Sequence, residues 1–133
     1  MPPAPRSPFA YGIIRVVPRI ERGEGFNAGI VVFCRPRRFL AARVELDAEV
    51  LRALDPGADE AAVRAQLDSI ARIAAGEADA GPIARLEPAE RFHWLVAPSS
   101  TVVQVAPVHT GLTDDPAATL ARLFEALVRR PPA

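Results

Sequence analysis

Polar side chains that could bind a ligand or transfer protons gather in RFHWLVAPSSTVVQVAPVHTG, residues 91–111. Two histidines, His93 and His109, could act as general acid and base, because the pKa of imidazole lies near neutrality. Guanidinium, hydroxyl and amide groups accompany them and form a set of candidate ligand-binding residues, with a glycine at its end: Arg91, Ser99, Ser100, Thr101, Gln104, Thr110 and Gly111.

The alternation in RFHWLV predicts a strand with Arg91 and His93 on one face and the aromatic Phe92 and Trp94 in the core. TVVQVA, joined to it by APSS, predicts a second strand. His109 comes just before a predicted helix, whose positive end favours anions. A lone histidine more often serves as a structural hydrogen-bonding group than as a catalyst, so both interpretations stay open.

A second polar group lies near the N-terminus. Arg15 interrupts the apolar run FAYGIIRVV, and a charge inside a strand is costly unless it is paired. It either forms a salt bridge with Glu21 or Glu45, or holds a guanidinium ready for a carboxylate or phosphate. The loop IERGEGFNAG adds three more candidate ligand-binding residues, Glu21, Arg22 and Asn27. The loop lacks the GxxxxGK[ST] phosphate-binding motif, and a strained hairpin connection is the alternative interpretation.

Several chemistries find no support in the residue spacing. No GxSxG motif surrounds Ser99 or Ser100, and no acid or thiol stands at metal-ligand spacing from the histidines. Two-histidine phosphoesterases place a hydroxyl residue two positions after each histidine, where this chain has Leu95 and Gly111. We expect no metal and no cofactor.

Charge and cysteine content narrow the partners. Residues 1–43 hold eight Arg and two acids, a net charge of +6, whereas residues 44–133 carry −6, and the whole chain is neutral. Neutrality and the shortage of aromatic residues disfavour nucleic acid, although the basic turn RPRRF remains one candidate contact for it. The lone Cys34 excludes an internal disulfide, and no apolar run approaches a membrane span. We expect a cytoplasmic protein.

The apolar patterns predict one α+β domain over residues 9–130, preceded by a Pro-rich, extended or disordered tail at 1–8. Three strands, 9–17, 29–34 and 39–46, should form an antiparallel meander within a sheet of about five mostly antiparallel strands. A short helix should begin at Asp47, and two main helices, 59–75 and one capped by Asp115, should pack on one face.

The stretches YGIIRVVPRIERGEGFNAGIVVFC and RFHWLVAPSSTVVQVAPVHTGLTDDPAATLARLF resemble the bacterial domain-of-unknown-function family 3037 from about residue 9 to 128. The residues that match the family's pattern include most of the candidates above: Arg15, Glu21, Arg22, Asn27, His93, Ser99, Ser100, Gln104, His109 and Gly111. No activity is established for that family. The resemblance implies a HipA-like kinase as a candidate partner, because members often look like small companions of such kinases encoded beside them.

Two hypotheses follow. In the first, the chain is a non-catalytic binding or regulatory module whose Arg and His residues take an anionic, phosphate-bearing ligand or a protein partner such as a HipA-like kinase. In the second, it is a small phosphoryl or nucleotidyl hydrolase that uses His93 or His109 as general acid and base. Both require the guanidinium groups of the first hairpin and the two imidazoles to line one hollow. The sequence leaves a homo-oligomer open.

Overall fold

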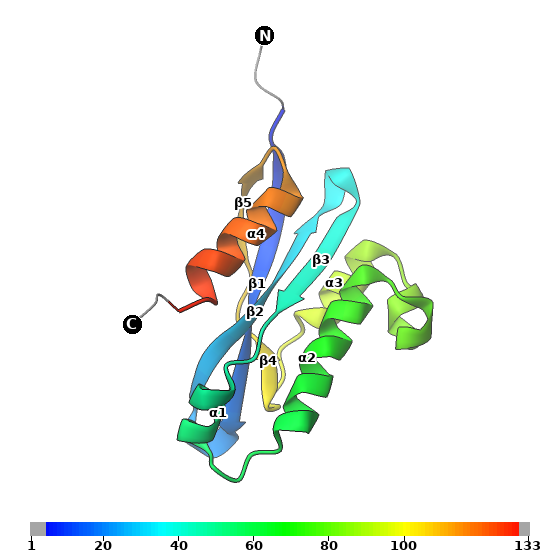
Figure 1. The fold of residues 1–133 in the computed structure, drawn as a ribbon. Coiled ribbons are helices and arrows are strands. Elements are labelled where there is room, and N and C mark those ends of the chain that lie inside the picture. The colour runs from blue at the N-terminus through cyan, green and yellow to red at the C-terminus, as the bar shows by residue number, and fades with distance from the viewer. Residues whose placement is uncertain (1–4, 131–133) are drawn as a thin grey trace.

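A five-stranded antiparallel sheet forms the centre of the molecule, which we describe over residues 5–130 of a computed structural model. Its order is β3-β2-β1-β4, with β5 also beside β1 (Figure 1). The strands are β1 (Ser7–Arg19), β2 (Glu24–Cys34), β3 (Phe39–Val44), β4 (Val103–Val105) and β5 (His109–Thr113). The expected single α+β domain and its N-terminal meander are confirmed. β1 begins inside the segment expected to be a tail, and residues 1–4 lie outside the described residues.

Four α-helices accompany the sheet within the described residues: α1 (Ala48–Leu54), α2 (Glu60–Ala75), α3 (Pro88–Leu95) and α4 (Pro116–Leu127). Aspartate side chains cap three of them, because Asp47, Asp59 and Asp115 each accept a hydrogen bond from a backbone N–H of the first turn. Gly76 ends α2 in the left-handed conformation (φ 74°), as its sequence position predicts.

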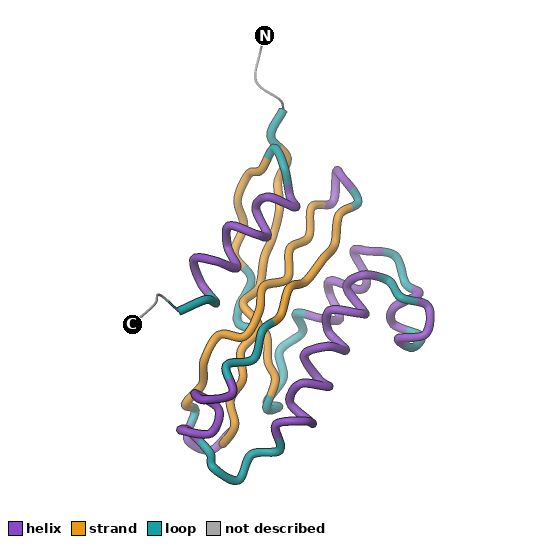
Figure 2. The backbone as a smooth tube through the Cα atoms, in the orientation of Figure 1, coloured by secondary structure: helices purple, strands orange, loops and turns teal. Residues whose placement is uncertain are grey.

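The helices cover both faces of the sheet, with α2 and α3 on one side and α4 on the other (Figures 1 and 2). Alternate residues of β2 supply the two cores: Val31 and Phe33 pack under α2 and α3, whereas Ile30 and Val32 pack under α4 around Phe124. The expectation that both main helices pack on one face is therefore wrong. A strand that is apolar on both sides needs cover on both sides.

The segment RFHWLV forms the greater part of helix α3 and not a strand. Pro88 stands in the first turn of the helix, where its missing N–H costs nothing. Phe92 and Leu95, three residues apart, form the buried side of the helix, and the Phe92 ring stacks on Phe33 at 5.0 Å between centroids. Trp94, expected in the core, is consequently 52% exposed.

Strands β4 and β5 both lie beside the same edge of β1. β4 pairs with residues 14–16 and β5 with residues 7–11, both antiparallel to β1. The strand predicted for TVVQVA is present but shorter, since β4 comprises only Val103–Val105. Strand β5 was not predicted. Gly111 of β5 faces Phe9, whose ring carbon would lie 2.8 Å from an added Cβ, so a side chain there would displace the ring.

Candidate functional site

Four of the predicted site residues share the face of the sheet that carries α4. Arg15 stands opposite Asn27 of β2 and Gln104 of β4, and directly paired residues point to the same side of a sheet. His109 pairs with Tyr11 and its ring stacks on that phenol at 5.3 Å between centroids. Arg15, Asn27 and Gln104 are thus brought side by side, whereas His109 lies on the same face four residues further along β1.

Arg15 is held by an amide and not by a carboxylate. Its Nε donates to Asn27 Oδ1 at 3.3 Å, and Asn27 Nδ2 donates in turn to the Leu127 carbonyl at 2.9 Å, at the end of α4. Within residues 5–130 it forms no ion pair, so the salt bridge with Glu21 or Glu45 is not made; Glu45 pairs with Arg129 instead. The chain Arg15–Asn27–Leu127 fastens the C-terminal end of α4 to the sheet.

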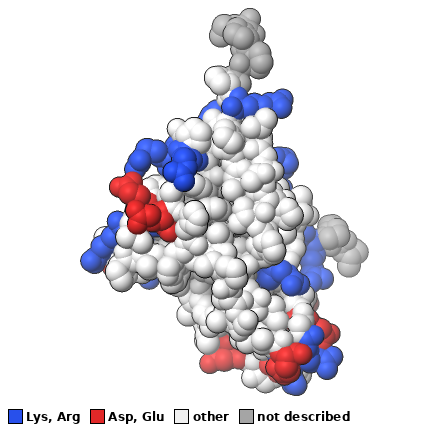
Figure 3. All heavy atoms as spheres, turned by 180° about the vertical axis from the view of Figure 1, so that it is seen from behind, with Lys and Arg blue, Asp and Glu red and all other residues white. Residues whose placement is uncertain are grey.

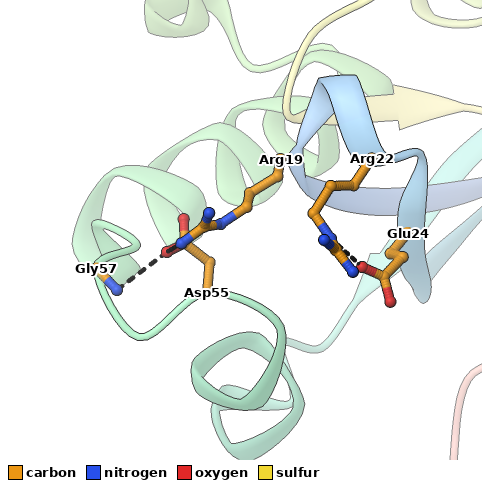
Figure 4. Close-up of polar contacts among 5 residues, drawn as sticks. All are labelled: Arg19, Arg22, Glu24, Asp55 and Gly57. Atoms are coloured by element: carbon orange, nitrogen blue, oxygen red, sulfur yellow. Dashed lines mark hydrogen bonds and ion pairs between the residues drawn. The ribbon is translucent and has the colours of Figure 1, made fainter.

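Two acids neutralise arginines of the hairpin between β1 and β2: Glu24 from the hairpin itself and Asp55 from the end of α1 (Figure 4). Arg22 donates to Glu24, and this hydrogen bond and its charge raise the pKa of Arg22 above its usual value. Arg19 pairs with Asp55 at 3.3 Å, and Asp55 also accepts from the Gly57 N–H at 3.0 Å. Glu21 is exposed at the hairpin tip. The hairpin therefore presents compensated guanidinium groups and no cluster of free positive charge.

Arg91 and His93 lie on α3, on the other face of the sheet. The Arg91 guanidinium donates to the carbonyl of Leu86 at 2.7 Å and to that of Ala74, near the end of α2, at 3.3 Å. The bond to Ala74 ties α3 to α2, and the bond to Leu86 ties it to the preceding connection. The His93 side chain is exposed, and neither histidine takes part in a side-chain hydrogen bond within the described range. The two imidazoles do not line one hollow.

A hollow of about 450 Å³ opens between α2, the end of α3 and strand β4. Three of the predicted residues, Ser99, Thr101 and Gln104, lie along it. Thr101 Oγ1 donates to the Val103 carbonyl at 2.7 Å and lies 3.1 Å from Ser99 Oγ. No charged side chain is among the lining residues, which are Gln66, Ser69, Ile70, Ile73, Trp94, Leu95, Ala97, Pro98, Ser99, Thr101, Val103, Gln104 and Val105. Ser100 and Thr110 are exposed outside this lining.

Most residues that line the hollow come from a longer segment of the chain that contains no charged residue. Between Arg91 and Asp114 the chain has no Asp, Glu, Lys or Arg, although these types make up 24% of the whole. Three large apolar side chains of this stretch are exposed, Trp94 (52%), Val108 (38%) and Leu112 (62%). Seen from behind, a broad central area of the surface carries no charged side chain, and the charges lie at its margins (Figure 3). The sequence analysis considered the polar residues of this stretch but overlooked that it contains no Asp, Glu, Lys or Arg.

A second hollow, of about 470 Å³, lies between the end of α4 and the β3–α1 connection. It contains Arg129 and Arg130, but Arg129 pairs with Glu45 at 3.3 Å and Arg130 with Asp47 at 3.4 Å. Both of its guanidinium groups are therefore already matched by carboxylates, and Glu49 adds a further negative charge to the lining. Among residues 5–130 no three His, Cys, Asp or Glu side chains are grouped so that they could hold a metal ion. None of the helices in this range is both long enough and apolar enough to span a bilayer.

The architecture defines a small α+β domain with one sheet between two helical layers. The chain belongs to the family described as a protein of unknown function (DUF3037), whose model matches residues 11–128. The resemblance found in the sequence is thus confirmed over nearly the same range. Neither the curated proteins nor the solved structures contain a match to the chain.

Proposed function

We propose that this protein is a non-catalytic binding module that docks a protein partner through its charge-free face. By this name we mean the exposed surface of residues 92–113 on the side of the sheet that carries α2 and α3, where Trp94 and Leu112 are exposed; exposed Val108 lies in the connection between β4 and β5. The observation that carries the proposal is the combination of these exposed side chains with the absence of charge. Protein interfaces are depleted of charged residues at their centre and enriched in aromatic ones.

An anionic ligand has less support. A site for phosphate needs guanidinium or amide donors that the protein itself has left free. Arg22 is paired with Glu24, Arg91 with two carbonyl groups, and Arg129 with Glu45. Arg15 forms no ion pair within residues 5–130, but its Nε donates to Asn27. It lies next to the C-terminal end of α4, which is the negative end of that helix dipole and disfavours an anion.

The hydrolase hypothesis also has less support. A general acid and base must both reach the reacting atoms. His93 lies on the side of the sheet covered by α2 and α3, and His109 stacks on Tyr11, which packs on the side of α4.

The family resemblance makes a HipA-like kinase the first partner to test. The experiment is a calorimetric titration of that purified kinase with this chain and two variants. Leu112→Arg places a charge in the charge-free face and should weaken the complex by about tenfold or more, because a buried unpaired charge is costly in an interface.

The matched control is Ile20→Arg. Ile20 is 45% exposed, similar to the face residues, but lies in the hairpin between Arg19 and Glu21. It should bind as the unchanged chain does. A complex that is absent at micromolar concentrations, or that tolerates Leu112→Arg as well as Ile20→Arg, would contradict the proposal.

A further inference from the structure

Strand β4 is the edge strand at one end of the sheet order, and the edge that faces away from β1 is unpaired among the residues that the structure describes. The sheet order ends with β4, and within residues 5–130 no further strand pairs with it. An open edge presents backbone N–H and C=O groups that have no partner in the sheet, and it can accept another strand.

The backbone groups on this open edge can be identified from the ladder. Ala106 N donates to Ile13 O at 2.9 Å, and Val17 N donates to Val102 O at 2.6 Å. In an antiparallel ladder every second residue bonds to the neighbouring strand, so Gln104 faces β1 and its two neighbours face outward. The outward residues are Val103 and Val105.

One of the outward groups is already used within the chain. The Val103 carbonyl accepts from Thr101 Oγ1 at 2.7 Å. The N–H of Val103 and both backbone groups of Val105 have no hydrogen-bond partner within residues 5–130, which is a pattern that an extended chain of two or three residues can complete.

The open edge runs along the hollow between β4 and α2. Ile70 and Ile73 of α2 form part of the opposite wall, and Trp94 and Leu95 belong to the end of α3. Because no lining side chain is charged, a charged side chain entering the hollow would lose its water without gaining a partner. The hollow thus matches an uncharged segment, in charge as well as in backbone pattern.

We propose that β4 binds an extended, uncharged segment of the partner protein as an added strand, with alternate side chains of that segment in the hollow beside Trp94. This inference rests on the proposed docking function and names the mode of docking. The occupant is a thin extended chain and not a second copy of this fold. β4 has only three residues and the hollow beside it measures about 450 Å³, which suits a short extended segment.

The decisive variant is Val105→Pro. Proline lacks the N–H, and at this position the lost N–H is the outward one, so the ladder with β1 stays intact. The matched control is Val105→Thr, which keeps the N–H and the branched side chain. Thermal unfolding of both variants shows whether the fold is preserved.

The probe is a phage-displayed library of random peptides, selected on the unchanged full chain. Selected peptides should share an uncharged stretch rich in β-branched residues. A synthetic copy should shift the emission of Trp94, the single tryptophan, to shorter wavelength. Val105→Pro should weaken its binding about tenfold or more, while Val105→Thr stays within about threefold.

A second measurement does not depend on folding of the proline variant. The same peptide with methyl groups on alternate backbone nitrogens should fail to bind the unchanged chain, because strand addition needs backbone donors. The inference is overturned if no peptide is selected, if the selected peptides are charged, or if binding survives both Val105→Pro and backbone methylation. If Leu112→Arg weakens the kinase complex and Val105→Pro does not, docking stands and strand addition falls. If neither weakens it, the proposed function falls as well.

Discussion

Replacing Asn27 by alanine tests whether the link between the sheet and α4 stabilises the fold. Asn27→Ala removes the hydrogen bond from Arg15 Nε (3.3 Å) and the bond to the Leu127 carbonyl (2.9 Å), both partly buried. Each such bond contributes about 1 kcal/mol net, so the free energy of unfolding should fall by about 2 kcal/mol. For a chain of this size the melting temperature should then drop by roughly 6–10 °C.

The assay is urea unfolding followed by circular dichroism, with an unchanged slope as the sign that only stability has changed. Asn27→Asp separates the two bonds, because a carboxylate still accepts from Arg15 but cannot donate to Leu127 O. Gln66→Ala is the matched control: Gln66 is an exposed amide of α2 that forms no side-chain hydrogen bond within residues 5–130. If Asn27→Ala lies within about 0.5 kcal/mol of the unchanged chain, as Gln66→Ala should, the reasoning is refuted.

Two further substitutions test local features of the fold by the same unfolding assay. The hydroxyl groups of Thr113 and Thr119 lie 2.6 Å apart, both buried, so Thr119→Val should cost about 1–2 kcal/mol. Thr113→Val should cost more, since Thr113 Oγ1 also accepts from the N–H of Asp115 at 3.0 Å; equal costs would contradict this assignment. Gly76→Ala forces a left-handed residue to carry a side chain and should cost about 1 kcal/mol, whereas Gly57→Ala, at a site with only ordinary contacts, should be neutral.

Residue types predicted the N-terminal strands and the last helix well. FAYGIIRVV and GIVVFC are apolar on both faces, which marks inner strands, and the Asp–Pro pair at 115–116 marks the start of α4. The same observation about β2 should have placed helices on both faces, since Ile30 and Val31 point in opposite directions and are both fully buried.

The sequence was ambiguous where α3 lies. In RFHWLV the apolar residues fit a period of two, but Phe92 and Leu95 also fit a helical spacing, and short apolar runs do not separate these cases. Pro88 after Glu87 was the signal that favoured the helix. Strand β5 was not predicted, because Gly111 has a low strand propensity. The reason for a glycine there is the ring of Phe9 on β1, which is distant in the sequence.

The candidate site residues were likewise predicted only in part. Arg15, Asn27, Gln104 and His109 reach one face because strand pairing brings distant segments together, which strand patterns alone do not reveal. Arg91 and His93 are not part of this group, because the segment predicted to be their strand forms helix α3. No residue pattern showed that Arg22 would be matched by Glu24.

Strand β1 is shared by two parts of the chain that are synthesised at different times. Its first neighbour, β2, follows within a few residues, whereas residues 45–102 must be made before β4 can reach the other side. Long-range pairing of this kind is slow, because a long loop must close first. The nascent protein therefore exposes an apolar central strand until its last third leaves the ribosome. A transcript that stops before β4 would yield a sheet inclined to aggregate through the bare side of β1.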